Sequence, residues 1–165
     1  MIPQVQRRRE QRGFTVIEIG VTLAIAGVVA AMALPSLADL LRTTRIKSAA
    51  TEMLSTLAYA RNEAITRNAQ VSIIASGSWS AGWRVMTNGT LLRQSSLNGD
   101  VIVNGPSENN VTYNPNGRMT TLTSLNFSFS VTGRNHVLMR CVSATLMGQP
   151  VMQSDTNRDG NCSNG

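Results

Sequence analysis

Few residues in this chain combine the side-chain chemistry and the spacing that catalysis or metal binding requires. His136 is the sole histidine among 165 residues, so the chain can form neither a two-histidine metal site nor a His-Glu-x-x-His helix. The sequence also lacks Gly-x-Ser-x-Gly, the phosphate-binding P-loop and Gly-x-Gly-x-x-Gly. We therefore expect a protein that is not an enzyme and that needs no cofactor.

The two cysteines, Cys141 and Cys162, are 21 positions apart and form no Cys-x-x-Cys pair. This spacing disfavours a zinc site and thioredoxin-like redox chemistry. Two interpretations remain, a disulfide or two free thiols.

One segment near the C-terminal end is similar to the start of a calcium-binding loop. Asp155, Asn157 and Asp159 alternate with other residues before Gly160, as in Asp-x-Asn-x-Asp-Gly. The bidentate acid at loop position twelve would be residue 166, beyond the last residue of the sequence, and Arg158 adds a positive charge. We therefore expect a hydrogen-bonded turn here in preference to a metal site.

The N-terminal segment indicates the compartment. Phe14 to Leu34 is an apolar run of 21 residues with a single charge, Glu18. As a helix it spans a hydrocarbon core of about 30 Å. Residues 1–13 before it carry +3 of the formal net charge of +6, mainly as arginine. The positive-inside rule then predicts a cytoplasmic N-terminus, a single span of the membrane and a C-terminal body in an oxidising compartment.

Three interpretations of this segment compete. In a conventional secretory signal the small residues Ala31 and Ala33 would mark the cleavage site, and a soluble exported β domain would begin at Leu34. A plain signal anchor fits the same residues. Neither explains Glu18, because an acid inside a membrane helix costs roughly 2.5–3.5 kcal/mol on insertion scales and usually has a partner or a function.

The pattern after Pro35 predicts that the helix continues. Apolar residues recur at steps of three and four from Leu37 to Ala64, which indicates an amphipathic helix to about Arg67. Proline removes one hydrogen bond and bends a helix without always ending it. We therefore expect one long helix, kinked at Pro35, whose membrane-spanning part is 14–34 and whose amphipathic part beyond the membrane is 35–68.

Residues 69–165 have the composition of a β-rich globular domain. Leu125 to Val131 alternates apolar and polar residues with a period of two, and Asn88-Gly89 is typical of a hairpin turn. Short apolar runs between turn signals predict eight strands: 71–75, 83–87, 91–94, 101–103, 111–113, 125–131, 137–142 and 150–153. The expected fold class is α+β, a long helix packed on an antiparallel β-sheet or sandwich.

The residues around the start of the apolar run resemble the class III signal of type IV prepilins and type II secretion pseudopilins. A short basic leader is followed by Gly13, Phe14, apolar residues and Glu18, the fifth residue counted from Phe14. The resemblance implies that a prepilin peptidase removes the leader 1–13 by cutting after Gly13 and methylates Phe14. It also implies that Glu18 pairs with the new amine of a neighbouring subunit during assembly, and that Pro35 lies at the usual kink.

The body carries a second, less specific likeness. Residues 60–65 (A-R-N-E-A-I), Gly82-Trp83, residues 113–118 (Y-N-P-N-G-R) and Cys141-Val142-Ser143 are similar to minor pilins of the FimT/FimU type and to the pseudopilin GspH. The resemblance implies a minor type IV pilin that helps to initiate or assemble a pilus at the filament tip, in twitching motility, adhesion or DNA uptake. Its partners would be the prepilin peptidase, other major and minor pilins or pseudopilins, and the inner membrane. A GspH-type minor pseudopilin of type II secretion is the alternative within the family.

The resemblance also implies a location, a single span of the inner membrane with a periplasmic C-terminal domain. Two further expectations depend on this location. An oxidising periplasm favours the disulfide between Cys141 and Cys162, which would stabilise the fold by about 3 kcal/mol. Some FimT-like proteins bind DNA through a C-terminal Gly-Arg-x-Arg motif, so a DNA-binding competence pilin is an alternative of another class. That motif is incomplete here, and the candidate DNA-binding residues are Arg118, Arg134, Arg140 and Arg158.

Overall fold

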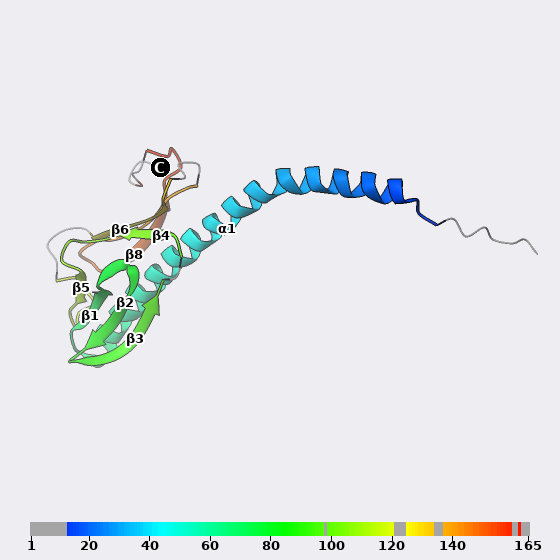
Figure 1. Cartoon of the computed structure of the whole chain (residues 1–165). Helices are drawn as coiled ribbons and strands as arrows, with labels where there is room; N and C mark the ends of the chain where they lie inside the picture. Colours follow the sequence, from blue (N-terminus) through cyan, green and yellow to red (C-terminus); the bar gives the residue numbers. More distant parts are fainter. Residues whose placement is uncertain (1–12, 98, 121–124, 134–136, 160–161, 163–165) are drawn as a thin grey trace, which may run out of the picture. The chain divides into compact units, whose positions relative to one another are not determined.

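In the computed structural model of the protein, the described residues are 13–97, 99–120, 125–133, 137–159 and 162. They form one helix followed by a series of short strands (Figure 1). The elements are α1 (Val16–Arg67), β1 (Val71–Ser76), β2 (Ser78–Thr87), β3 (Thr90–Ser96), β4 (Val101–Asn104), β5 (Asn110–Tyr113), β6 (Leu125–Val131), β7 (Arg140–Ala144) and β8 (Pro150–Ser154). The chain divides into two compact units, Met1–Ala38 and Asp39–Gly165.

Helix α1 has 52 residues and continues through Pro35, as the amphipathic pattern predicts. It ends at Arg67 because Asn68 adopts a left-handed conformation with φ of 49°. The N–H of Asn68 bonds to the carbonyl of Ile65, and the N–H of Ala69 bonds to that of Ala64, each at 3.2 Å. This pair of bonds is a Schellman cap, which stops a helix at asparagine or glycine. The bend expected at Pro35 stays a prediction.

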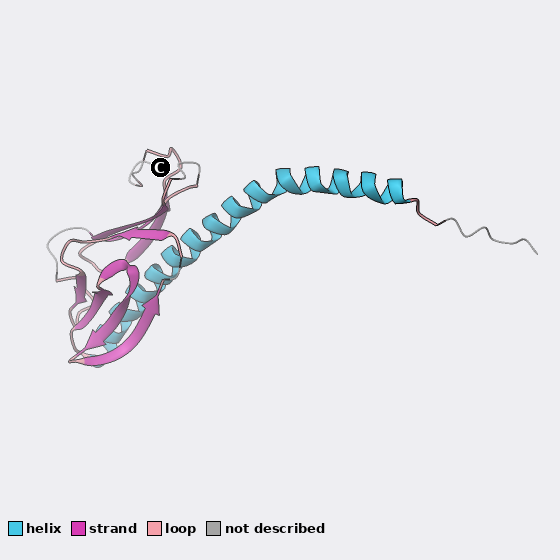
Figure 2. Cartoon of the chain, in the orientation of Figure 1, coloured by secondary structure: helices cyan, strands magenta, loops and turns pink. Residues whose placement is uncertain are grey.

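The strands form two antiparallel sheets of four strands each (Figure 2). Sheet A has the order β3-β2-β1-β5, and sheet B has the order β4-β6-β7-β8. Asn88 and Gly89 both have positive φ, 46° and 78°, in the turn between β2 and β3. A two-residue hairpin with both φ values positive is the type I′ turn that Asn-Gly predicts. The α+β fold class is thus confirmed.

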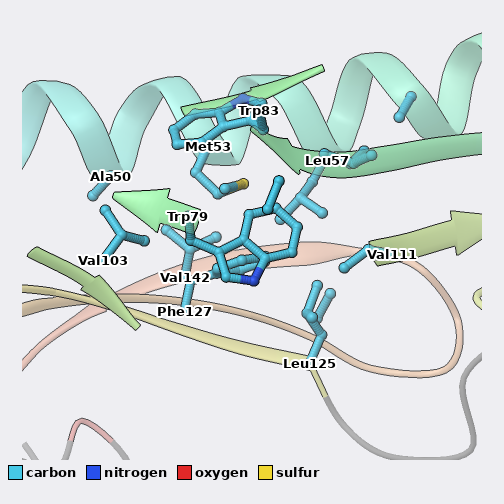
Figure 3. Packing of buried hydrophobic residues seen from close by; sticks show 14 of the residues in the cluster. Ala50, Met53, Leu57, Trp79, Trp83, Val103, Val111, Leu125, Phe127 and Val142 are labelled. Carbon is cyan, nitrogen blue, oxygen red and sulfur yellow. The ribbon is translucent and has the colours of Figure 1, made fainter. Parts of the chain in front are cut away.

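A single hydrophobic core contains side chains from α1 and from both sheets. The buried positions of α1 recur at steps of three and four, as required for one helix face, and are Ile46, Ala49, Ala50, Met53, Leu57, Ala60 and Ala64. Trp79 of β2 meets Phe127 of β6 edge to face, with ring centroids 4.8 Å apart (Figure 3). Trp83 donates a hydrogen bond from Nε1 to Thr56 Oγ1 at 3.1 Å, which satisfies the indole in the core.

Two strands, β2 and β7, differ from the expected ranges by more than two residues at one end. β2 begins at Ser78, five residues before the expected start. The added residues include Trp79 and Ser80, and no strand was expected there because the small residues among them are typical of loops. β7 covers Arg140–Ala144, whereas the sequence predicted 137–142. The register explains this shift, because Leu125 of β6 lies opposite Ala144 and the pairing ends at Phe129 and Arg140.

Candidate processing, assembly and binding sites

The expected processing site lies just before α1. Gly13 and Phe14 precede the helix, and the Phe14 side chain is 79% exposed. Thr15 caps the helix, because its Oγ1 accepts a hydrogen bond from the N–H of Glu18 at 3.2 Å. Threonine three residues before glutamate is the capping-box pattern, a signal in the sequence that identifies this helix start. The cap places the Glu18 carboxylate in the first turn, where the helix dipole favours a negative charge.

The apolar run that follows is uncovered in the structure. Helix α1 includes a window that is long and apolar enough to cross a membrane, and none of that window is buried. Large aliphatic side chains at Ile17, Leu23, Val29 and Leu34 are each more than half exposed. Within the described chain, the Glu18 carboxylate forms no ion pair. Such a surface requires lipid or other protein chains to cover it.

Charged pairs lie on the part of α1 that belongs to the second unit. Arg42 contacts Asp39 at 3.1 Å and Asp100 at 3.4 Å, and Arg45 contacts Asp100 at 3.2 Å. Asp100 lies between β3 and β4, so these contacts join that connection to the helix. A hydrogen bond from its own backbone N–H, followed by Arg45 and Arg42, lowers the pKa of Asp100. Pairs as exposed as these contribute little to stability.

Two of the described DNA-binding candidates, Arg118 and Arg140, lie at separate places. Arg118 follows the Asn114–Gly117 turn, and the next residue, Met119, bonds to the carbonyl of Leu146 in the β7–β8 turn. Arg140 is at the opposite end of β7, where its guanidinium donates to Ser154 Oγ. β7 spans the five residues Arg140–Ala144, so its two ends are about 13 Å apart at 3.3 Å per residue. Arg158 is exposed in the C-terminal segment, and Arg134 lies outside the described residues. DNA binding therefore stays a prediction.

The calcium-like segment forms a local turn. Asn157 Nδ2 donates to Asp159 Oδ2 at 3.0 Å, and Asn157 Oδ1 accepts from the N–H of Asp159 at 3.4 Å. Asp155 is buried, 3% exposed. In the parts of the chain that the structure describes, no three acidic, histidine or cysteine side chains come together to hold a metal ion. The hydrogen bonds fit the expected asparagine-rich turn.

Cys141 and Cys162 form a disulfide with Cα atoms 6.0 Å apart. Cys141 lies opposite Ser128 in the β6–β7 register, and Ser128 alternates with the buried Phe127 and Phe129. Cys141 is therefore on the face of sheet B that points away from the core. Both half-cystines are buried, so the C-terminal segment covers this part of the outer face.

Ser80 is a structurally important residue that the sequence patterns do not indicate. Ser80 Oγ accepts a hydrogen bond from the N–H of Val103 at 2.9 Å and donates one to the carbonyl of Val103 at 3.3 Å. A single side chain of sheet A thus pairs with both backbone groups of one residue on the β4 edge of sheet B. No sequence signal marks it, because an isolated serine is common in strands and loops.

Comparisons with known proteins agree with the fold and with the presence of a methylation motif near the N-terminus. Residues 49–148 match the family described as type II transport protein GspH, and residues 8–34 match the prokaryotic N-terminal methylation motif. Among curated proteins, none matches the sequence.

Two crystal structures of the type IV minor pilin FimU from Pseudomonas aeruginosa have a similar fold. In space group P21 the identity is 23% and the TM-score 0.59, over 67% of this chain and 89% of FimU. In space group P65 the identity is 24% and the TM-score 0.57, over 65% of this chain and 91% of FimU. At this level of identity the likeness shows the fold alone. Because the family match covers more than half of the chain and a methylation motif precedes it, this protein belongs to the GspH family of type IV minor pilins and pseudopilins.

Proposed function

We propose that this chain is a minor type IV pilin that takes part in initiating or assembling the filament at its tip. A prepilin peptidase removes residues 1–13, cutting after Gly13, and methylates the amine of Phe14. Residues 14–34 then hold the subunit in the inner membrane, 35–68 form the periplasmic part of the helix, and 69–165 form the exposed β domain. The protein acts by assembly and not by catalysis.

The methylation motif over residues 8–34 is the observation that carries this proposal. It coincides with the helix start at Val16 and with the uncovered apolar surface of α1. A membrane covers that surface before assembly, and neighbouring helices cover it afterwards. The same segment therefore serves as an anchor and as an assembly contact.

Glu18 gives the assembly its register. Cleavage after Gly13 would create a positive amine at Phe14, four residues before the carboxylate of Glu18. In a filament the carboxylate of one subunit pairs with the amine of its neighbour, because an unpaired charge away from water is costly. The exposed carboxylate and the Thr15 cap, which leaves the first helical turn intact, support this role.

The test measures the N-terminus and the filament separately. The full chain is isolated from membranes of cells with and without a prepilin peptidase, and its intact mass and N-terminal residue are determined. We expect a methylated Phe14 in the presence of the enzyme and an uncut chain in its absence. Glu18→Gln, which removes the charge at nearly constant size, should still be cleaved but should reach the filament poorly. A chain that begins at Leu34 would instead establish a conventional signal peptide and overturn the proposal.

A GspH-type pseudopilin of type II secretion is the second candidate, because residues 49–148 match a family that carries that name. Deletion of the gene distinguishes the two systems. Loss of surface pili with normal protein secretion supports the pilin, whereas loss of secretion with normal pili supports the pseudopilin.

A further inference from the structure

Strand β8 forms an edge of sheet B, and one side of its backbone pairs with no strand among the described residues. Its ladder partner is β7, with five residue pairs from Arg140–Ser154 to Ala144–Pro150. Apart from that ladder, no hydrogen bond among the described residues involves the backbone of 150–154. An edge of this kind is a template for another strand.

One hydrogen bond fixes which backbone groups point outward. The N–H of Asp155 donates to the carbonyl of Met139 at 3.1 Å, one position beyond the end of the ladder. Hydrogen-bonded pairs alternate along an antiparallel ladder, so Gln153 and Val151 bond to β7, and Ser154, Met152 and Pro150 do not. Pro150, which has no N–H, therefore lies on the outward side, where it costs no ladder bond.

The other sheet edges are less available. Ser80 occupies the edge of β4 through its two bonds to Val103. Thr120 donates its N–H to the carbonyl of Thr112 at 3.0 Å, which occupies the edge of β5. The ladder that β3 forms with β2 shifts register after Val85, and β3 contains Arg93; a bulge and a charge both discourage further pairing. β8 has a regular register and no charged residue.

The outward groups of β8 are complementary to those of a second β8. In an antiparallel pair with a two-fold axis at Met152, the two Met152 residues exchange a pair of N–H to carbonyl bonds. Each Ser154 N–H then faces the Pro150 carbonyl of the other copy. The single missing donor, at Pro150, faces the Ser154 carbonyl. On the outer face Val151 of one copy lies opposite Gln153 of the other, so no like charges meet.

We propose that β8 docks a second copy of this chain by antiparallel β8–β8 pairing centred on Met152, which joins the two B sheets into one. A two-fold contact is closed and cannot propagate into a filament. The pair is therefore a state of subunits held in the membrane before assembly, and this last placement rests on the proposed function.

Cross-linking of the full chain in membranes tests the contact. Two copies with different tags are co-expressed, and one carries a photoreactive benzoylphenylalanine in place of Val151, which is 52% exposed. The matched site is Ile102, an exposed residue of β4 at the opposite edge of the same sheet. We expect a product that contains both tags from position 151, at least tenfold more abundant than from position 102.

Backbone variants then test the hydrogen bonds. Met152→Pro removes an N–H that points away from β7, whereas Met152→Ala shortens the same side chain and keeps the N–H. We expect Met152→Pro to abolish the two-tag product and Met152→Ala to retain it. Equal products from the two variants would overturn β8 pairing.

If Met152→Pro does not fold, a pair of surface variants provides a test that leaves the backbone unchanged. Val151→Lys with Gln153→Lys places like charges opposite each other in the pair, and Val151→Lys with Gln153→Glu places opposite charges there. The two tagged copies should co-purify about tenfold less in the first variant than in the second. Equal co-purification would reject the register centred on Met152.

The remaining outcomes separate this proposal from the proposed function. A position-151 product with one tag, whether within one copy or with another protein, overturns the second-copy contact. Phe14 is analysed in the same membranes. Methylated Phe14 without the two-tag product rejects β8 pairing alone, whereas unprocessed Phe14 rejects the proposed function.

Discussion

Tyr113, the first residue of the segment 113–118 (Y-N-P-N-G-R), helps to join three parts of the fold. Its hydroxyl donates to the carbonyl of Gly148 at 3.2 Å, and Gly148 has no room for a side chain, because a Cβ would lie 2.3 Å from the carbonyl oxygen of Gly117. Arg61 of α1 donates to that same oxygen at 3.0 Å. The motif from Tyr113 to Arg118 therefore connects the end of α1, the turn after β5 and the β7–β8 turn. Its role is structural.

Replacement of Tyr113 by phenylalanine should reduce stability and change its dependence on pH. The lost hydrogen bond costs about 1 kcal/mol. Burial raises the pKa of the Tyr113 phenol, with a smaller opposing effect from Arg61. The unfolded phenol loses its proton near pH 10, so the native chain keeps this contribution below about pH 10 and loses it as the pH rises further. Urea unfolding at pH 8 and pH 10.5 measures both effects.

Tyr59→Phe is the control for this prediction, because Tyr59 is only partly buried and its hydroxyl makes no hydrogen bond within the described residues. We expect Tyr113→Phe to be less sensitive than the native chain to the change from pH 8 to pH 10.5, and Tyr59→Phe to behave like the native chain. The same alkaline loss in Tyr113→Phe would contradict the assignment to this phenol.

At the scale of elements, the least predictable feature is how the two sheets meet. Ser80 holds the N–H and the carbonyl of Val103, a buried residue at the β4 edge. These two hydrogen bonds satisfy the N–H and the carbonyl of Val103 at the edge of sheet B without another strand pairing there.

Ser80→Ala should therefore destabilise the fold by about 1–3 kcal/mol, the usual cost of leaving a buried backbone group without a partner. Ser78→Ala is the matched control in the same strand, because the Ser78 hydroxyl accepts its hydrogen bond from Ala81 at an exposed position. Thermal unfolding of the two variants gives the comparison. Equal destabilisation would show that the hydrogen bonds from Ser80 to Val103 contribute no more to stability than the exposed hydrogen bond of Ser78.

The sequence predicted elements with strong local patterns and missed those set by distant partners. The alternation from Leu125 to Val131 predicted β6 to the residue, and the helix ended at Arg67 as expected. The N-terminal half of β2 was missed, because Ser78, Ser80 and Gly82 lack an apolar alternation and owe their conformation to β1, β3 and β4. Among the candidate sites, the methylation motif is local and was read directly, whereas the Ser80 contact depends on a strand 23 residues away.

At the scale of the whole molecule, the two units place their apolar residues differently. Every buried apolar residue in the described chain lies at Ile46 or beyond, within the unit Asp39–Gly165. The other unit exposes its apolar side chains. The unit Asp39–Gly165 therefore contains the whole hydrophobic core of the described residues, including the buried face of α1 from Ile46 to Ala64.

Removal of residues 1–38 should leave the stability of the unit Asp39–Gly165 nearly unchanged. No apolar side chain that is buried in the described part of the structure is lost, and the Arg42 and Arg45 contacts to Asp100 are retained. Urea unfolding of residues 39–165 and of the full chain in mild detergent should give midpoints that agree closely. As a control, Phe127→Ala in the truncated chain should cost about 3–5 kcal/mol, the usual cost of emptying a core aromatic site. A large difference between the urea midpoints of the unsubstituted truncated chain and the full chain would show that the first unit stabilises the core.

The disulfide stabilises the domain from outside that core. Cys141 lies on the outer face of sheet B, and neither cysteine is part of the hydrophobic cluster. Replacing both cysteines by serine should cost about 3 kcal/mol for a loop of 21 residues, and protease should then cut the segment after β8 first. The native chain in reductant is the control, because it breaks the same bond without a substitution. We expect the substitution and the reductant to lower the free energy of unfolding equally, while the fluorescence of Trp79 and Trp83 in the folded protein stays native. The disulfide then acts on the C-terminal segment and not on the core. Loss of the native fluorescence before the unfolding transition would contradict this separation.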